Sequence, residues 1–125
     1  MRYTLLLHYP EMSPESLGAE GMAEGERAFQ SYAAALDAAG VLISAEVLQP
    51  SVSTTTVRLV DGGVQVQDGP FADTKEQLGG TFVIDVPDLD AALGWAGEAP
   101  SVSWGTVEVR PGAVYYADGA WRPNA

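Results

Sequence analysis

The chain has 125 residues, of which 46% are hydrophobic, and this size suits one domain with a single modest core. Its net charge of −11 comes with only six Lys and Arg residues scattered along the chain, so nucleic acid and anionic membranes are not expected partners. Because there is no cysteine and no long apolar run, we expect a cytoplasmic protein without disulfides, thiolate metal sites or transmembrane helices.

The first part of the chain predicts a strand, a helix and a second strand. Arg2–Tyr9 is a strand whose consecutive leucines suit cover on both faces. Residues 10–18 are expected to form a loop, and the helix after them ends at Gly40. This helix, at 20–39, has one apolar face made of Phe29, Tyr32, Ala33 and Leu36. A second strand is predicted at 41–48.

The middle of the chain predicts a hairpin followed by a long connection. Strand 54–60 is rich in β-branched residues, and the turn at 61–63 joins it to a strand at 64–67. The connection Asp68–Gly80 spans thirteen residues and begins with the turn sequence Asp-Gly-Pro. Connections of this length are often functional or mobile. The next strand is predicted at 81–86.

The last part predicts a second helix, a strand and an aromatic tail. Asp88 is the expected N-cap of the helix and Pro100 ends it. The apolar stripe of that helix is formed by Leu89, Ala92, Leu93 and Ala96. A strand follows at 104–110, and the aromatic residues of 112–125 predict a small hairpin that covers the sheet or a partner subunit. The whole order predicts an α+β fold of the split β-α-β type with an inserted hairpin.

Each expected strand carries one apolar face and one mixed face. If two helices cover the apolar face, the mixed face must meet solvent, a cavity or another subunit. Trp104 falls in register with the mixed face. The ionisable members of that face are His8, Arg58, Asp85, Glu108 and Arg110.

We predict that two subunits pack their mixed faces together and enclose a polar pocket. Arg58 and Arg110, with Glu108 beside them, would bind a substrate, because guanidinium groups pair well with carboxylates and phenolates. His8 is the preferred general base, because imidazole changes its charge near neutral pH. The alternative is that the same side chains form ion pairs at a subunit interface and catalyse nothing.

The long connection adds further candidates. Asp73 and Glu76 are candidate catalytic groups that assist His8, and Lys75 is a candidate substrate-binding group at the pocket mouth. The alternative for all three is a solvated loop, and Asp68 is expected to hold the turn. One histidine, no cysteine and no Gly-rich phosphate loop argue against a metal or cofactor, with only a His–carboxylate site left open.

Four residues of the long connection, Asp68–Phe71, read DGPF, and the run through Gly80 resembles the signature of the DGPF-type branch of the YCII-related proteins. The resemblance covers residues 1–111 and leaves 112–125 as a C-terminal extension. It implies a ferredoxin-like fold, paired into a dimeric α/β barrel, and no settled activity. The other matching segments are Thr54–Arg58, Leu89–Ala92 with Trp95-Ala96, and Gly105–Pro111.

The resemblance also implies a place for acid–base chemistry. Better-understood relatives have a His on the first helix and an Asp just before the Pro that ends the second helix. Phe29 and Ala99 stand at those positions, so this pair is missing and other residues, such as His8, would have to act.

Two functions follow from these expectations. The first is a protein that binds a small, anionic organic molecule at a dimer interface, with lyase- or isomerase-like acid–base activity if it is an enzyme. The alternative is a non-catalytic regulatory or interaction module. That alternative comes from the resemblance, because members of the DGPF branch are often associated with extracytoplasmic-function sigma factors.

Overall fold

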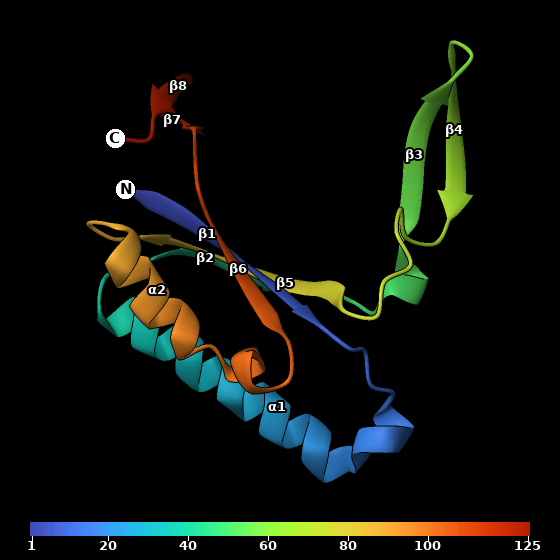
Figure 1. The fold of residues 1–125 in the computed structure, drawn as a ribbon, viewed down its shortest axis with the longest axis horizontal. Coiled ribbons are helices and arrows are strands. Elements are labelled where there is room, and N and C mark those ends of the chain that lie inside the picture. Colours follow the sequence, from blue (N-terminus) through green and yellow to red (C-terminus); the bar gives the residue numbers. More distant parts are fainter.

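The computed structural model describes residues 1–125 and is built around one four-stranded antiparallel sheet (Figure 1). Its strands, from edge to edge, are β2 (Leu42–Val47), β5 (Gln77–Asp85), β1 (Arg2–Tyr9) and β6 (Thr106–Pro111). Helix α1 (Pro14–Ala38) connects β1 to β2, and α2 (Leu89–Gly97) connects β5 to β6. This order is the split β-α-β arrangement, so the predicted α+β class is confirmed. The single chain forms no closed barrel.

Helix α1 begins earlier than predicted. Ser13 is its N-cap, and the Ser13 hydroxyl accepts a hydrogen bond from the Ser16 backbone N–H at 3.1 Å. Pro14 occupies the first turn, where its missing N–H is harmless. The expected loop at 10–18 is therefore wrong in its second half, although Gly18, with φ of 73°, kinks the helix there. No helix is both long and apolar enough to span a membrane.

The hydrophobic core lies between the sheet and the two helices, which cover the same face of the sheet (Figure 1). In α2 the predicted stripe is partly wrong, because Leu89 and Leu93 are about half exposed. The other two members of the predicted stripe, Ala92 and Ala96, are buried as expected. The buried core consists of Tyr3, Leu5 and Leu7 of β1, Phe82, Ile84 and Val86 of the β5 segment, Tyr32 and Leu36 of α1, and Ala92, Ala96 and Ala99 in and after α2.

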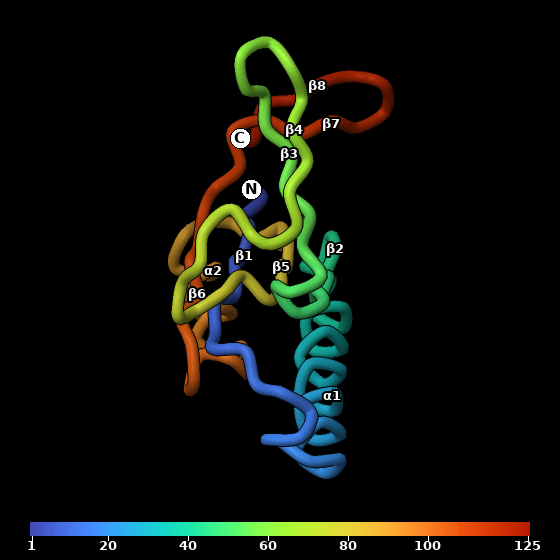
Figure 2. Tube along the Cα trace, turned by 90° about the vertical axis from the view of Figure 1, so that its right-hand side faces the viewer, coloured from blue at the N-terminus to red at the C-terminus, as the bar shows by residue number.

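The inserted hairpin stands apart from the main sheet. Strands β3 (Thr55–Val60) and β4 (Gly63–Asp68) pair only with each other, and Figures 1 and 2 show them projecting away from the helices. We call this pair the hairpin arm. A short 3-10 turn, η1 (Ser51–Ser53), precedes it. Arg58 lies in β3, so its predicted place on the mixed face of the main sheet is wrong. Alternation along a strand shows which residues share a face, but it does not identify the strand's partner.

A second, smaller hairpin follows β6. Strands β7 (Val114–Ala117) and β8 (Ala120–Pro123) pair around a turn in which Asp118 and Gly119 both have positive φ. The Asn124 side chain fixes this tail to β1, because it accepts from the Arg2 N–H at 2.7 Å and donates to the Arg2 carbonyl at 2.9 Å. The two hairpins thus stand at opposite ends of the uncovered sheet face (Figure 1).

Candidate functional site

The face of the main sheet that the helices leave uncovered, called the open face here, carries four of the five predicted ionisable residues, in two separate groups. At one end, His8 Nε2–H donates to Oε1 of Glu108 at 2.6 Å. Arg110 Nη2 lies 4.0 Å from the other carboxylate oxygen of Glu108 and is 73% exposed. At the opposite end, Asp85 accepts from the N-terminal amine at 2.7 Å. The ionisable side chains of the mixed face therefore form the series His8–Glu108–Arg110 at one end and a separate ion pair of Asp85 with the N-terminal amine at the other.

A β-bulge shapes the His8 end of the open face. The β1–β5 pairing runs Leu7 with Gly80 and then His8 with Leu78, so Gly79 is the extra residue. Strict alternation would place Leu78 on the helix-covered face, but the bulge turns it to the side of His8. A side chain at 79 would overlap the Tyr9 ring, which packs across this glycine, and would fit only if that ring moved.

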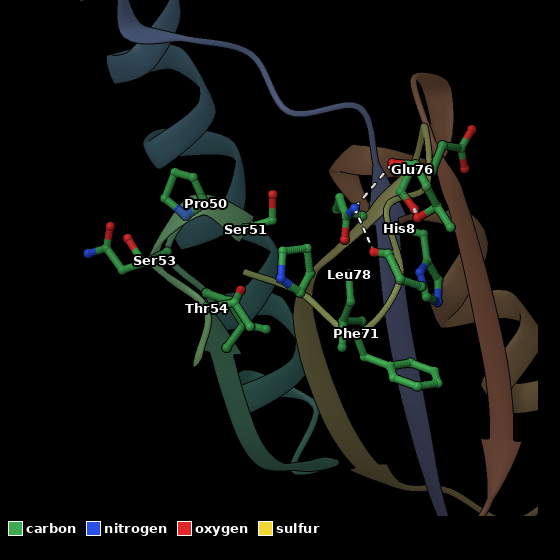
Figure 3. Close-up of a pocket in the computed structure, with 14 residues that line it drawn as sticks. His8, Pro50, Ser51, Ser53, Thr54, Phe71, Glu76 and Leu78 are labelled. Atoms are coloured by element: carbon green, nitrogen blue, oxygen red, sulfur yellow. Dashed lines mark hydrogen bonds between the residues drawn. The ribbon is translucent and has the colours of Figure 1, made fainter. Parts of the chain in front are cut away.

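A cavity of about 730 Å³ lies against this end of the open face, between His8 and the base of the hairpin arm. We call it the loop cavity. Figure 3 shows His8, Phe71 and Leu78 on one side and the η1 segment on the other. Its polar lining residues are His8, Gln49, Ser51, Ser53, Thr54, Thr74, Glu76 and Gln77, and its apolar ones are Leu48, Pro50, Pro70, Phe71, Ala72 and Leu78.

The loop that closes this cavity is held by its own hydrogen bonds. The Gln77 side-chain amide donates to the carbonyls of Ala72 and Thr74 at 3.1 and 3.2 Å (Figure 3). The Thr74 hydroxyl donates to the Glu76 carbonyl at 2.8 Å. Because β5 begins at Gln77, the connection is shorter than the thirteen residues predicted. Phe71 stands at the rim with 84% of its surface exposed.

The predicted site residues are only partly brought together. His8 and Glu76 line the loop cavity, and Glu108 reaches it through its bond to His8. Asp73 and Lys75 are exposed on the loop and do not line the cavity. The predicted pair of arginines is separated: Arg58 is on the hairpin arm, and Arg110 pairs with Glu108 outside the cavity lining.

Sequence reasoning missed the wall of the loop cavity that precedes β3. Ser51, Ser53 and Thr54 line it, in and beside η1. The interruption at Pro50 was the available signal, because a proline after a strand frees the following hydroxyl residues from sheet pairing. Phe71 was also missed, since an aromatic residue inside a turn sequence does not by itself indicate that it borders a cavity.

Trp104 lies on the opposite side of the sheet from its predicted place. It precedes β6, and its ring meets those of Tyr9 and Phe29 at centroid distances of 4.9 and 6.5 Å. Gly105 allows the chain to turn there, because a side chain at this position would overlap the His8 carbonyl. Trp104, Tyr9 and Phe29 line a second cavity of about 1010 Å³, called the helix cavity here.

The two positions of the missing acid–base pair lie on the helix side. Phe29 stacks on Phe82 with ring centroids 6.4 Å apart, and Ala99 is buried in the core. Neither side chain can transfer a proton.

Two tyrosines on the helix side have raised pKa values. Burial raises the pKa of Tyr9, and the nearby charge of Glu11 adds to this effect. Burial, with a smaller contribution from Glu98, raises the pKa of Tyr32 to about 12. Both phenols therefore stay protonated at neutral pH.

Comparison with known proteins gives one family. The family model for the YCII-related domain matches residues 1–112. An uncharacterized protein of Rhizobium meliloti (strain 1021) is 44% identical over 79 residues, which is 62% of this chain and 64% of that relative. The matched region thus spans somewhat less than two thirds of the relative's length.

Proposed function

The chain belongs to the family of proteins with a YCII-related domain, and we propose that it binds a small, weakly acidic organic molecule in the loop cavity and takes a proton from it through His8. The observation that carries this proposal is the His8–Glu108 hydrogen bond of 2.6 Å at the wall of a cavity of about 730 Å³. An imidazole, a carboxylate hydrogen-bonded to it and space for a small molecule occur together there.

Glu108 would determine which nitrogen of the His8 imidazole carries the proton. A carboxylate that accepts from Nε2–H keeps the proton on that nitrogen, so Nδ1 carries the lone pair that can accept another proton. Once His8 is protonated, the negative charge of Glu108 stabilises the imidazolium. The pair therefore supports general base chemistry of the lyase or isomerase kind, in which one proton moves from a carbon or a hydroxyl group.

The ligand class follows from the rest of the lining. Hydroxyl and amide groups on the η1 side offer hydrogen bonds, and Pro70, Phe71 and Leu78 offer apolar contact. No arginine lines the cavity, so we propose a ligand that binds as a neutral phenol or enol. It becomes an anion only when His8 takes its proton, and the imidazolium then pairs with it. Glu76 is placed to accept a hydrogen bond from the ligand.

We also propose that the protein is a cytoplasmic homodimer in which a second copy covers the open face. The two hairpins flank that face at its ends (Figure 1). One face of the hairpin arm is apolar and exposed, and an isolated two-stranded hairpin is at best marginally stable in water. Its residues Val57, Leu59, Val64 and Val66 are each 63–72% exposed.

The same arm favours a second candidate function, a non-catalytic module in which it docks onto another protein, such as one in a sigma-factor pathway. Under this alternative the His8–Glu108–Arg110 chain is only a structural ion-pair chain. The two candidates differ in whether the loop cavity takes a small molecule.

The test uses 4-nitrophenol as the probe and nitrobenzene as its match without the hydroxyl group. Binding of 4-nitrophenol with proton transfer should raise the phenolate absorbance at a fixed pH. His8→Gln and Glu108→Gln should weaken this binding at least ~10-fold, because each removes one member of a paired site. Asp85→Asn, at the other end of the open face, is the control and should bind as the wild type does. Equal binding of both probes, or no effect of His8→Gln, would contradict the proposal.

A further inference from the structure

The helix cavity is a second site that the proposed function does not use. It has a volume of about 1010 Å³ and lies on the helix-covered side of the sheet, beside the first half of α1. The N-terminal end of α1 extends past the ends of the strands (Figure 1), and the cavity lies between this half of α1 and residues of β1, β2 and β5. Met12, Leu17 and Met22 line this cavity and remain 57%, 38% and 39% exposed. An apolar surface of this kind is available to a ligand.

Two glycines in α1 keep the space open. Gly21 and Gly25 are one turn apart and line the cavity, although glycine inside a helix costs about 1 kcal/mol relative to alanine. At Gly25 an added Cβ would meet no atom within 4 Å, so the core does not require a glycine there. A larger side chain at 25 would occupy the cavity without disturbing the packed core.

The inner wall of the cavity is aromatic. The Trp104 ring makes edge contacts with Tyr9 and Phe29, and Phe29 stacks on Phe82. The faces of such rings carry negative potential and attract a cation within about 6 Å of the ring centre.

The charged residues that line the cavity have one sign, and Arg27, which follows Glu26 in α1, is not among them. Glu24, Glu26 and Glu46 line it, and no Lys, Arg or His does. All three carboxylates are exposed at the rim. The net charge of −11 adds a long-range attraction for cations and repels fatty acids and other amphipathic anions.

We propose that the helix cavity binds an organic cation with an apolar body, such as a hydrophobic amine or a quaternary ammonium compound. The charged group lies between the aromatic wall and the three glutamates, and the apolar body contacts Met12, Leu17 and Met22. This site is independent of His8 and of the proposed function, because the sheet separates the two cavities.

The test uses benzyltrimethylammonium as the cation and benzylsulfonate as an anion of similar shape. Calorimetric titration, with Trp fluorescence as a second readout, should show the cation binding at least ~10-fold more tightly than the anion. Added salt should weaken the binding of the cation, since the rim charges are exposed. Equal or tighter binding of the sulfonate would overturn the proposal.

Two sets of variants locate the site. Gly25→Leu should abolish cation binding while Gly25→Ala retains it, and both should unfold at or above the wild-type midpoint, because each replaces a helical glycine. The double variant Glu24→Gln/Glu26→Gln should weaken cation binding about 3- to 10-fold, because it removes two exposed carboxylates. Asp37→Asn/Asp61→Asn makes the same change in net charge away from the cavity and should bind as the wild type does.

The remaining outcomes are also decisive. If Gly25→Leu keeps its affinity for benzyltrimethylammonium, the site is elsewhere and the proposal fails. If neither ion binds and Gly25→Leu turns an oligomer into a monomer, the cavity is a contact between copies of the chain, and the proposal fails as well. Loss of 4-nitrophenol binding in His8→Gln with unchanged cation binding would show that the two cavities bind their ligands independently.

Discussion

The two cavities lie on opposite faces of one sheet, and consecutive residues of β1 serve them. His8 lines the loop cavity on the open face, while Tyr9 lines the helix cavity on the covered face. The first cavity offers hydroxyl groups, amides and a paired imidazole, whereas the second offers aromatic rings and rim carboxylates. The comparison shows how the two-residue period of a strand gives one short segment two unrelated chemistries.

Truncation of a phenylalanine should lower the stability strongly on the covered face and hardly at all on the open face, and this is the largest effect we expect. Phe82 is 2% exposed in the core, so Phe82→Ala should lower the free energy of unfolding by ~3–5 kcal/mol. Phe71 is 84% exposed, so Phe71→Ala should change it by less than about 0.5 kcal/mol while weakening 4-nitrophenol binding. Urea unfolding of both variants is the measurement. Similar losses of stability would contradict the division into covered and open faces.

Tyr32 should make the covered face sensitive to high pH. Its pKa of about 12 in the folded state lies above the ordinary value of 10.0, so its contribution to stability is complete below pH 10. That contribution, roughly 2–3 kcal/mol, should be lost as the pH rises through about 12. Unfolding free energies of wild type and Tyr32→Phe, compared at about pH 8 and about pH 11.5, measure it.

Tyr32→Phe should be less stable by ~1 kcal/mol at the lower pH, because the hydroxyl donates to the Trp95 carbonyl at 2.6 Å. At the higher pH its stability should fall less than that of the wild type. Tyr116→Phe is the control, because Tyr116 is exposed on the tail hairpin. Parallel losses in all three proteins would mean that Tyr32 is not the group responsible.

The exposed apolar face of the hairpin arm should be buried by a second copy of the chain. Leu59→Asp should weaken the dimer by ~1–2 kcal/mol or more, which is a loss of about 5- to 30-fold. Gln65→Asp adds the same charge on the other face of the arm and should leave the dimer intact. Sedimentation at micromolar concentration distinguishes them, and a monomeric wild type would remove the homodimer proposal.

Local patterns predicted much of the fold. Helical spacing from Phe29 to Leu36 identified the buried side of α1, and Asp88 caps α2 by accepting from the Ala91 N–H at 2.9 Å. Alternation in β1 and in the last strand placed His8 and Glu108 on one face, where they meet. These features depend on neighbours within a few residues or on the period of a regular strand.

The features that were not predicted depend on contacts between distant segments. Arg58 was misplaced because the turn at 61–63 predicts the β3–β4 hairpin but does not show that this hairpin stands apart from the main sheet. Trp104 was misplaced because the close approach of Gly105 to the His8 carbonyl turns the chain before β6. Leu78 changes face through the bulge at Gly79. The helix cavity depends on how the first half of α1 lies against β1, β2 and β5, which no local pattern shows.

The most direct test of the central claim is the nitrogen NMR spectrum of the imidazole, which is unambiguous because His8 is the only histidine. In the free protein we expect His8 to carry its proton on Nε2 and a lone pair on Nδ1. Addition of 4-nitrophenol should protonate both nitrogens, whereas nitrobenzene should not, and Glu108→Gln should lose the response. An imidazole spectrum that stays unchanged at saturating 4-nitrophenol would contradict the assignment of His8 as the proton acceptor of the loop cavity.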